Sequence, residues 1–177
     1  MSESPDHFAR FGLPRRYSID RKALEAAYER LTLAHHPDFY ATAPAAQRAQ
    51  AERTAAEVNA GYRVLSDDFE RAGYLLGLVA GGRKLDPNSL APEFLSEMFD
   101  LQEHAEALLA ENDLARLKDM RRTIAAEREA VRMHLDSLFE AIGGDPATDD
   151  LQSIQSDLNC ERYLQRLLAR LDGQRDD

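Results

Sequence analysis

The chain has 177 residues, of which 44% are hydrophobic, and this is enough for one ordinary domain or for two small domains with packed cores. Aromatic residues make up 7%, Trp is absent and Ala, Leu, Glu and Arg dominate, so the composition favours an all-α fold over a sheet. The formal net charge of −10 argues against a nucleic-acid-binding protein, which would need a basic face. No run approaches the ~18 apolar residues of a membrane-spanning helix.

The charges and the single cysteine narrow the possibilities further. Residues 1–80 carry ten Lys and Arg against eleven Asp and Glu, whereas residues 81–177 carry twelve against twenty-one, which suggests two halves with different partners. Cys160 is the single cysteine, so we expect a small core residue, no disulfide and no cysteine-bound zinc or iron–sulfur cluster; we also expect no metal site and no cofactor. The polar, acidic start of the chain resembles neither a signal peptide nor a transit peptide, and we therefore expect a cytoplasmic location.

The first elements in chain order are two helices that end at a polar corner. A short helix over 6–11 stops at Gly12-Leu13-Pro14. The next helix has Ser18 and Asp20 as candidate caps and ends at His35. Pro37 lacks a backbone donor and forces the preceding residue out of helical geometry, so His36 and Asp38 should project from a fixed loop. The apolar positions that define the second helix are Leu24, Tyr28 and Leu31.

A loop with Pro44 and one long helical segment follow this corner. The spacing of apolar residues predicts that this segment continues without a break to about residue 72. A segment rich in turn formers, residues 81–91, then interrupts the helical pattern, so we predict a first domain over 1–80, a linker and a second domain over 92–177. The stripe of the long segment consists of Ala51, Ala55, Val58, Tyr62, Leu65, Phe69 and Ala72.

Three helices joined by short loops are predicted for the second domain, as an antiparallel bundle. They cover residues 92–111, a segment from about Asp113 to the Gly143-Gly144-Asp145-Pro146 stop, and about 149–171. In the third helix the stripe drifts between Leu158 and Cys160, which predicts a bend or a late start. The core stripe of the first comprises Phe94, Met98, Leu101, Ala105, Leu108 and Leu109, and that of the second Leu117, Met120, Ile124, Val131, Leu135, Leu138 and Ile142.

Two apolar residues of the helix over 92–111 lie outside its core stripe. Leu95 and Phe99 are one turn apart on a flank, with Asp100 and Glu103 beside them, and such a group is typical of a partner surface with an acidic rim. An equally weighted alternative is that the two apolar residues widen the core contact. Tyr163 lies at the edge of the third stripe, either half exposed at an interface or as a core-edge tyrosine.

The order of short helix, helix, exposed His-Pro-Asp loop and long antiparallel helix resembles a J-domain. Residues 8–14 (FARFGLP), 58–65 (VNAGYRVL) and 71–76 (RAGYLL) are similar in particular to HscB-type co-chaperones, and the resemblance covers nearly the whole chain. In that family a J-domain delivers an iron–sulfur scaffold protein to a dedicated DnaK-like ATPase.

The resemblance implies two binding surfaces and no catalytic residues. A DnaK/HscA-type chaperone would bind His36, Pro37 and Asp38 together with the basic face of the preceding helix, Arg21, Lys22 and Arg30, although Glu25 and Glu29 share that helix. An IscU-type scaffold would bind Leu95, Ser96, Phe99, Asp100, Glu103 and Tyr163, where Ser96 stands in place of an expected larger apolar residue.

Two alternatives stay open. One is a J-domain protein whose bundle binds a different client. The other is a metal-dependent hydrolase that uses His35, His36 and Asp38, although adjacent residues at a helix end point in different directions and no distant ligand is spaced to join them. The chain has no nucleotide-binding glycine loop and no nucleophile elbow, so we expect it not to be an enzyme.

Overall fold

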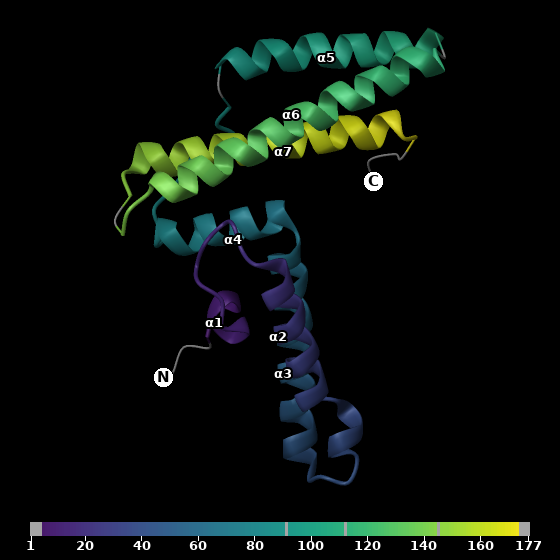
Figure 1. Ribbon diagram of the computed structural model, residues 1–177. Coiled ribbons are helices and arrows are strands. Elements are labelled where there is room, and N and C mark those ends of the chain that lie inside the picture. Colours follow the sequence, from purple (N-terminus) through teal and green to yellow (C-terminus); the bar gives the residue numbers. More distant parts are fainter. Residues whose placement is uncertain (1–4, 91, 112, 145, 174–177) are drawn as a thin grey trace. The chain divides into compact units, whose positions relative to one another are not determined.

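The computed structural model describes residues 5–90, 92–111, 113–144 and 146–173. All regular secondary structure in these ranges is helical (Figure 1), which confirms the predicted all-α class. The chain forms two compact units, residues 1–75 and 76–177, and the boundary falls inside α4 (Asp68–Ala80). The expected linker 81–91 therefore belongs to the second unit as far as it is described; Ala91, residues 1–4 and Asp145 lie outside the described residues.

The first two helices begin and end where the sequence places their caps. In α1 (His7–Phe11) the Asp6 side chain accepts from the Ala9 N–H, and Gly12 ends the helix with a left-handed φ of 70°. In α2 (Arg21–Ala34) an Asp20 carboxylate oxygen accepts from the Lys22 and Ala23 N–H groups at 2.9 and 3.2 Å. Asp20, rather than Ser18, is thus the cap of α2.

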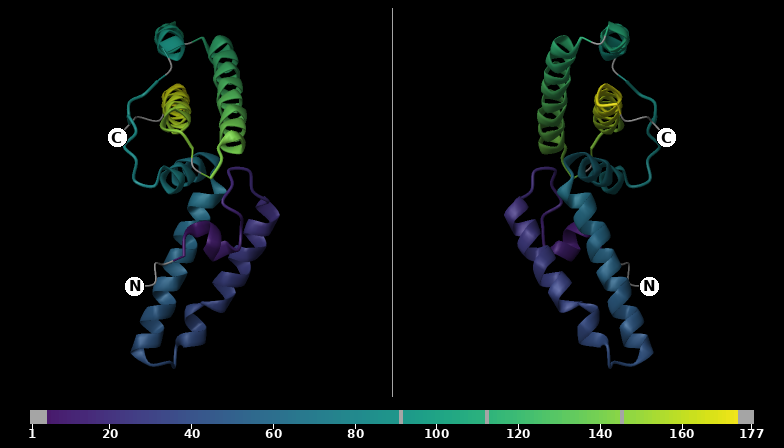
Figure 2. Two further views of the ribbon diagram at one scale, coloured as in Figure 1. Left: turned by 90° about the vertical axis from the view of Figure 1, so that its left-hand side faces the viewer. Right: turned by 90° about the vertical axis from the view of Figure 1, so that its right-hand side faces the viewer.

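Helices α2 and α3 (Ala45–Ser66) form an antiparallel hairpin, and all views show them side by side (Figures 1 and 2). Its interface includes Tyr28 and Tyr62, whose rings stack with centroids 4.1 Å apart. Gly61 lies where α1 meets α3: a Cβ there would be 2.9 Å from Cε2 of Phe11, so only glycine lets the helices approach this closely. The buried residues that close this unit's core include Phe8, Phe11, Leu24, Ala27, Val58 and Leu65.

The prediction of one continuous helix through residue 72 is wrong at Asp67. Helix α3 ends at Ser66, and Asp67 takes extended backbone angles (φ −92°, ψ 127°). Its Oδ1 accepts from the N–H groups of Phe69 and Glu70 at 2.9 and 2.8 Å, which caps α4. Aspartate bonds to backbone N–H groups more favourably at a helix start than inside a helix, and this preference overrides the continuous apolar stripe.

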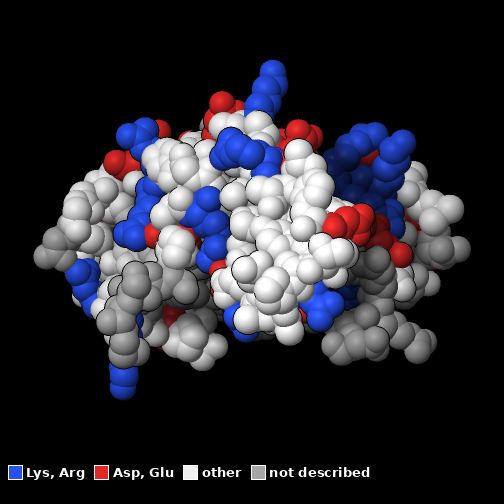
Figure 3. Space-filling model, turned by 90° about the horizontal axis from the view of Figure 1, so that it is seen from below, with Lys and Arg blue, Asp and Glu red and all other residues white. Residues whose placement is uncertain are grey.

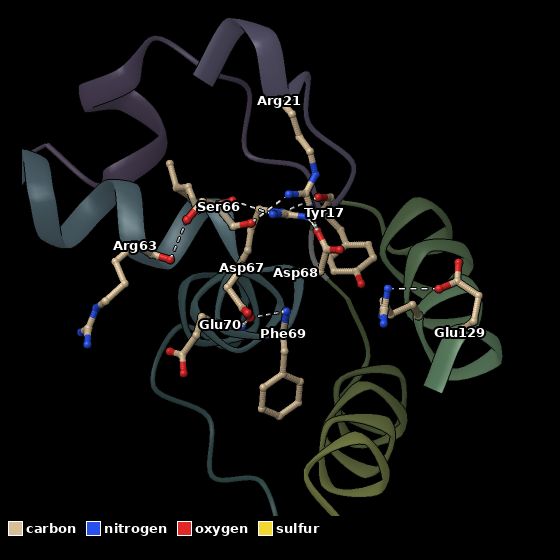
Figure 4. A network of polar contacts seen from close by, with 12 residues as sticks. Tyr17, Arg21, Arg63, Ser66, Asp67, Asp68, Phe69, Glu70 and Glu129 are labelled. Atoms are coloured by element: carbon tan, nitrogen blue, oxygen red, sulfur yellow. Dashed lines mark hydrogen bonds and ion pairs between the residues drawn. The ribbon is translucent and has the colours of Figure 1, made fainter. Parts of the chain in front are cut away.

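A buried arginine joins the helix ends around this break. The Arg71 guanidinium donates to the carbonyl oxygens of Tyr17 at 2.7 Å and Leu65 at 2.5 Å, pairs with Asp68, and lies 5.4 Å from the centre of the Tyr17 ring. Arg21 of α2 also pairs with Asp68, at 2.6 Å, and Figure 4 shows these groups converging. The segment before α2, the end of α3 and the start of α4 are therefore fixed to one another.

The second unit contains the three predicted helices. They are α5 (Pro92–Glu111), α6 (Leu114–Ala141) and α7 (Thr148–Leu171); α6 packs along α7, and α5 packs on both. Leu109 was predicted in the core, but its side chain is 37% exposed, whereas Ala105 and Leu108 on the neighbouring face of α5 are buried. The shared core is Ala105, Leu108, Leu117, Met120, Ile124, Leu164, Leu167 and Leu171.

Helix α7 is continuous, so the predicted late start is wrong. Four successive residues, 158–161, are buried, because α7 is covered on more than one side. Asn159 donates its amide to the carbonyl oxygens of Pro87 and Ser89 at 3.0 and 2.8 Å, while Glu161 pairs with Arg128 of α6 at 2.5 Å. The apparent drift of the apolar stripe reflects this second covered side.

The segment before α5 is fastened to α7. The Gln152 side-chain amide accepts from the Asp86 N–H at 2.9 Å and donates to the Asp86 carbonyl at 3.1 Å. Both backbone groups of Asp86 are therefore bonded to one side chain. Together with the two Asn159 bonds, these contacts hold residues 86–89 against the helix. We call residues 86–89 the strap.

Candidate docking surfaces

The His-Pro-Asp motif lies where α2 gives way to a short 3-10 helix, η1 (Pro37–Tyr40), in a segment expected to be a loop. His36 has extended backbone angles (φ −64°, ψ 133°), as a residue before proline should. Its Nδ1 accepts from the Asp38 N–H at 3.3 Å, so the neutral tautomer that fits this bond carries its proton on Nε2. The side chains of His36 and Asp38 are 47% and 85% exposed.

Hydrogen bonds hold this corner in one conformation. The His36 N–H donates to the Leu33 carbonyl at 3.3 Å, and the Phe39 N–H donates to the His36 carbonyl at 3.1 Å. The Tyr40 hydroxyl donates to the Ala34 carbonyl at 3.4 Å and returns η1 to the end of α2. The imidazole is thus presented to a partner on a preformed support, which lowers the ordering cost of binding.

The three basic residues of α2 are not equivalent. Arg21 is bound to Asp68 and to the Ser66 carbonyl, and it lies about 20 Å from His36 along the helix at 1.5 Å per residue. Within the described ranges, Lys22 and Arg30 have no ion-pair partner, and both are exposed. Glu25, on the same helix, accepts from the Tyr62 hydroxyl at 2.7 Å.

Two exposed apolar residues beside the motif were not predicted from the sequence. Leu33 and Phe39 are 65% and 66% exposed, and the Phe39 ring meets the His36 ring edge-on at 6.1 Å. A signal was present, because at 3.6 residues per turn Leu33 lies about 180° around α2 from the buried Leu24. The end of the first unit that holds η1 faces the viewer in Figure 3, where uncharged side chains cover a broad area.

The motif does not gather a metal-ligand set. The Nδ1 of His36 lies 3.6 Å from an Asp38 carboxylate oxygen, and this nitrogen already accepts a backbone hydrogen bond. In the part of the chain that the structure describes, no three His, Cys, Asp or Glu side chains are grouped so that they could hold a metal ion. Among the described residues no helix has the length and apolar character that crossing a membrane requires.

The second predicted surface lies on α5. Within the second unit Phe99 is 71% exposed and Leu95 is 40% exposed. Ser96, Asp100 and Glu103 are exposed on the same helix. A large exposed aromatic residue with a second apolar residue one turn away is a candidate contact surface for another protein.

Tyr163 of α7 reaches the same stretch of α5. Its hydroxyl lies 3.1 Å from the Met98 carbonyl and 3.2 Å from the Gln102 side-chain oxygen, and its ring meets Phe94 edge-on at 6.3 Å. The side chain is half-buried, and burial raises the pKa of the Tyr163 hydroxyl. The ring therefore supports the α5 surface and keeps an exposed edge.

Cys160 takes no part in either surface. The thiol is buried, and burial, with the nearby Asp157 carboxylate, raises its pKa to about 12. The thiol is therefore protonated and unreactive at neutral pH.

An antiparallel helical hairpin that presents an exposed His-Pro-Asp corner, followed by a separate helical bundle, defines a J-domain co-chaperone. The chain belongs to the HscB co-chaperone family. Residues 90–172 match the family described as the HSCB C-terminal oligomerisation domain.

Relatives and solved structures agree with this assignment. The HscB homologue of Azoarcus sp. is 34% identical over 143 residues, covering 80% of this chain and 81% of the relative. That of Ralstonia nicotianae is 32% identical over 173 residues, covering 97% and 98%. The chaperone HscB of Vibrio cholerae superposes with a TM-score of 0.75 at 26% identity, with 96% of both chains covered. Human HscB superposes at 0.81 and 22% identity over 98% of this chain and 84% of the human chain, which shows a shared fold.

Proposed function

We propose that this chain is a co-chaperone in iron–sulfur cluster biogenesis. Its J-domain stimulates the ATPase of a DnaK/HscA-type chaperone, and its bundle carries an IscU-type scaffold protein to that chaperone. Binding both proteins at once raises the effective concentration of the scaffold at the chaperone. The work is done by binding rather than by chemistry of its own, and the cytoplasm is the compartment we propose for it.

The observation that carries the chaperone half is the preformed corner. His36 is held through Nδ1 while its side chain is 47% exposed, and the Asp38 carboxylate beside it is an exposed acceptor. A fixed donor and acceptor pair, presented without reordering, can bind one conformation of a partner ATPase better than another. Such differential binding is what shifts the ATPase toward its hydrolysing state.

The test of this half is single-turnover ATP hydrolysis by the DnaK-type chaperone with the full chain added. His36→Gln should abolish the stimulation while the melting temperature stays within about 1 °C of wild type, because an exposed residue contributes little to stability. His35→Gln, at the neighbouring histidine, is the matched control and should stimulate normally. Full stimulation by His36→Gln would exclude this mechanism, and loss with both variants would favour a site that needs the two histidines.

The scaffold half rests on the exposed surface of α5. Leu95 and Phe99 supply apolar area, Asp100 and Glu103 an acidic rim, and Tyr163 supports the same stretch of helix. The centre of a protein interface is commonly an aromatic residue with apolar neighbours and a polar rim. We assign Ser96, exposed between the two apolar residues, to the same surface.

Calorimetric titration of the IscU-type scaffold into the full chain tests this half. The double change Leu95→Ala and Phe99→Ala should weaken binding by about 2–4 kcal/mol, as expected for central anchors of an interface. Leu114→Ala is a matched control, because Leu114 is as exposed as Phe99, at 71%, on another helix of the bundle. Chaperone stimulation in the absence of scaffold should be unchanged in both variants.

A J-domain protein with a different client is the remaining alternative. If the scaffold fails to bind while the His36-dependent stimulation is intact, the bundle serves another protein. Equal scaffold affinity of wild type and the Leu95/Phe99 variant would instead place the scaffold elsewhere on the chain.

A further inference from the structure

Leu33 and Phe39 are two large apolar side chains exposed by about two thirds, three residues before and three residues after His36, and the Phe39 ring contacts the His36 ring edge-on. Backbone hydrogen bonds connect both residues to His36. The His36 N–H donates to the Leu33 carbonyl, and the Phe39 N–H donates to the His36 carbonyl. Exposed apolar residues scattered singly need no explanation, but these two are held next to a polar docking group.

The electrostatic attraction available to the corner is weak. Of the three basic residues on α2, Arg21 is bonded to Asp68 and the Ser66 carbonyl. This leaves Lys22 and Arg30, and the same helix carries two acidic residues, Glu25 and Glu29. Two positive against two negative charges give little net field to attract a partner, and salt screens it further. A tight contact at this corner therefore needs another source of binding free energy.

We propose that Leu33 and Phe39, three residues before and after His36 in the chain, form an apolar clamp that packs onto an apolar patch of the DnaK-type ATPase. The inference deepens the proposed function and rests on it, since the occupant is the chaperone that docks at the same corner. The clamp supplies affinity, and His36 with Asp38 supplies the effect on hydrolysis. Aromatic residues next to a desolvated polar group are frequent centres of binding energy.

The division of roles can be measured with the full chain and the DnaK-type ATPase. Phe39→Ser and Leu33→Ser should each raise the Kd for the ATPase about tenfold or more, while stimulation at saturating concentration stays near wild type. Phe39→Met keeps the apolar area and should stay within about threefold of the wild-type Kd. Met133→Ser is the matched control, because Met133 on α6 is 66% exposed, as is Phe39.

The outcomes separate this inference from the proposed function. A Kd within about twofold of wild type for Phe39→Ser and Leu33→Ser overturns the clamp, whatever happens to stimulation. Normal stimulation by His36→Gln overturns the proposed function. A raised Kd of the serine variants would in that case still support the clamp, because it is measured independently of stimulation. If Phe39→Ser lowers the melting temperature, Leu33→Ser and Phe39→Met decide the question, and equal weakening by Met133→Ser counts against the clamp.

Discussion

Arg21 and Arg30 are on the same helix, yet their charges are used differently. Arg21 pairs with Asp68 in the group that fixes α4, whereas Arg30 is exposed and has no ion-pair partner within the described residues. Charges near a docking site mainly change the rate at which partners meet. The two arginines should therefore respond to mutation in different assays.

Arg30→Glu should slow association with the chaperone several-fold at low ionic strength and have little effect at high salt, because salt screens exposed charges. Arg21→Glu should instead lower stability by about 1 kcal/mol, since it removes one exposed ion pair. Stopped-flow measurements on both variants give the association rates, and thermal melting gives the changes in stability. Equal association rates for wild type and Arg30→Glu would remove Arg30 from the docking surface.

Single-residue environments could be predicted only where the helical wheel settles them. The flank position of Phe99 follows from 3.6-residue periodicity, and the structure leaves its ring exposed. Arg71 could not be foreseen as a buried residue, because its three backbone and carboxylate partners come from separate segments. The exposure of Leu109 depends on which part of α5 the other helices cover, and the spacing of apolar residues does not predict this.

At the scale of elements, the starts of helices could be predicted from the sequence, whereas breaks between helices could not. The bounds of α5 and the Asp113 cap of α6 follow from proline and aspartate preferences at helix starts. The Asp67 break and the four-residue η1 were not predicted, because a local side-chain bond and a short 3-10 turn differ from α-helix by small free energies. The bonds of the strap to Gln152 and Asn159 could not be predicted, because these partners are some 70 residues away in sequence.

The strap gives a test of the second unit. Asn159→Ala removes both bonds to the Pro87 and Ser89 carbonyls, and the lost pairing of partly buried groups should cost about 1–3 kcal/mol of unfolding free energy. Hydrogen exchange of residues 86–90 should accelerate in the same variant. Ser153→Ala, on the same helix but bonded only to its own turn, is the control for denaturant unfolding.

Comparable exchange of residues 86–90 in wild type and Asn159→Ala would mean that the strap is not held by this amide. A fall in stability without faster exchange would place the cost in the core of α7 instead.

At the scale of the whole molecule, one titrating group in each unit, His7 in the first and Asp157 in the second, should change stability with opposite signs as the pH falls. Burial, and the nearby Arg10 guanidinium, lower the pKa of His7, which stacks on Tyr74 at 4.5 Å. The unfolded chain then takes up this proton more readily than the folded one, so stability present above about pH 6.5 is lost as the pH falls below it. Burial raises the pKa of Asp157, despite its ion pair with His134. Protonation of this carboxylate as the pH falls therefore favours the folded state of the second unit.

Hydrogen exchange measured at about pH 7 and about pH 5.5, corrected for intrinsic rates, should show lower protection of α1 and α3 at the lower pH and no matching loss in α7. His7→Phe keeps a ring against Tyr74 and cannot titrate, so it should remove most of the change in α1 and α3. An undiminished change in this variant would assign the effect to other groups.

The chemistry of Cys160 has a practical consequence. It is the only cysteine of the chain, and its buried thiol stays protonated at neutral pH. Maleimide reagents should therefore leave the native protein unlabelled, and a thiol added by Ala41→Cys or Ser96→Cys, both at exposed positions, would be the one that reacts. A single fluorophore could then be placed at either the chaperone corner or the α5 surface without labelling of Cys160.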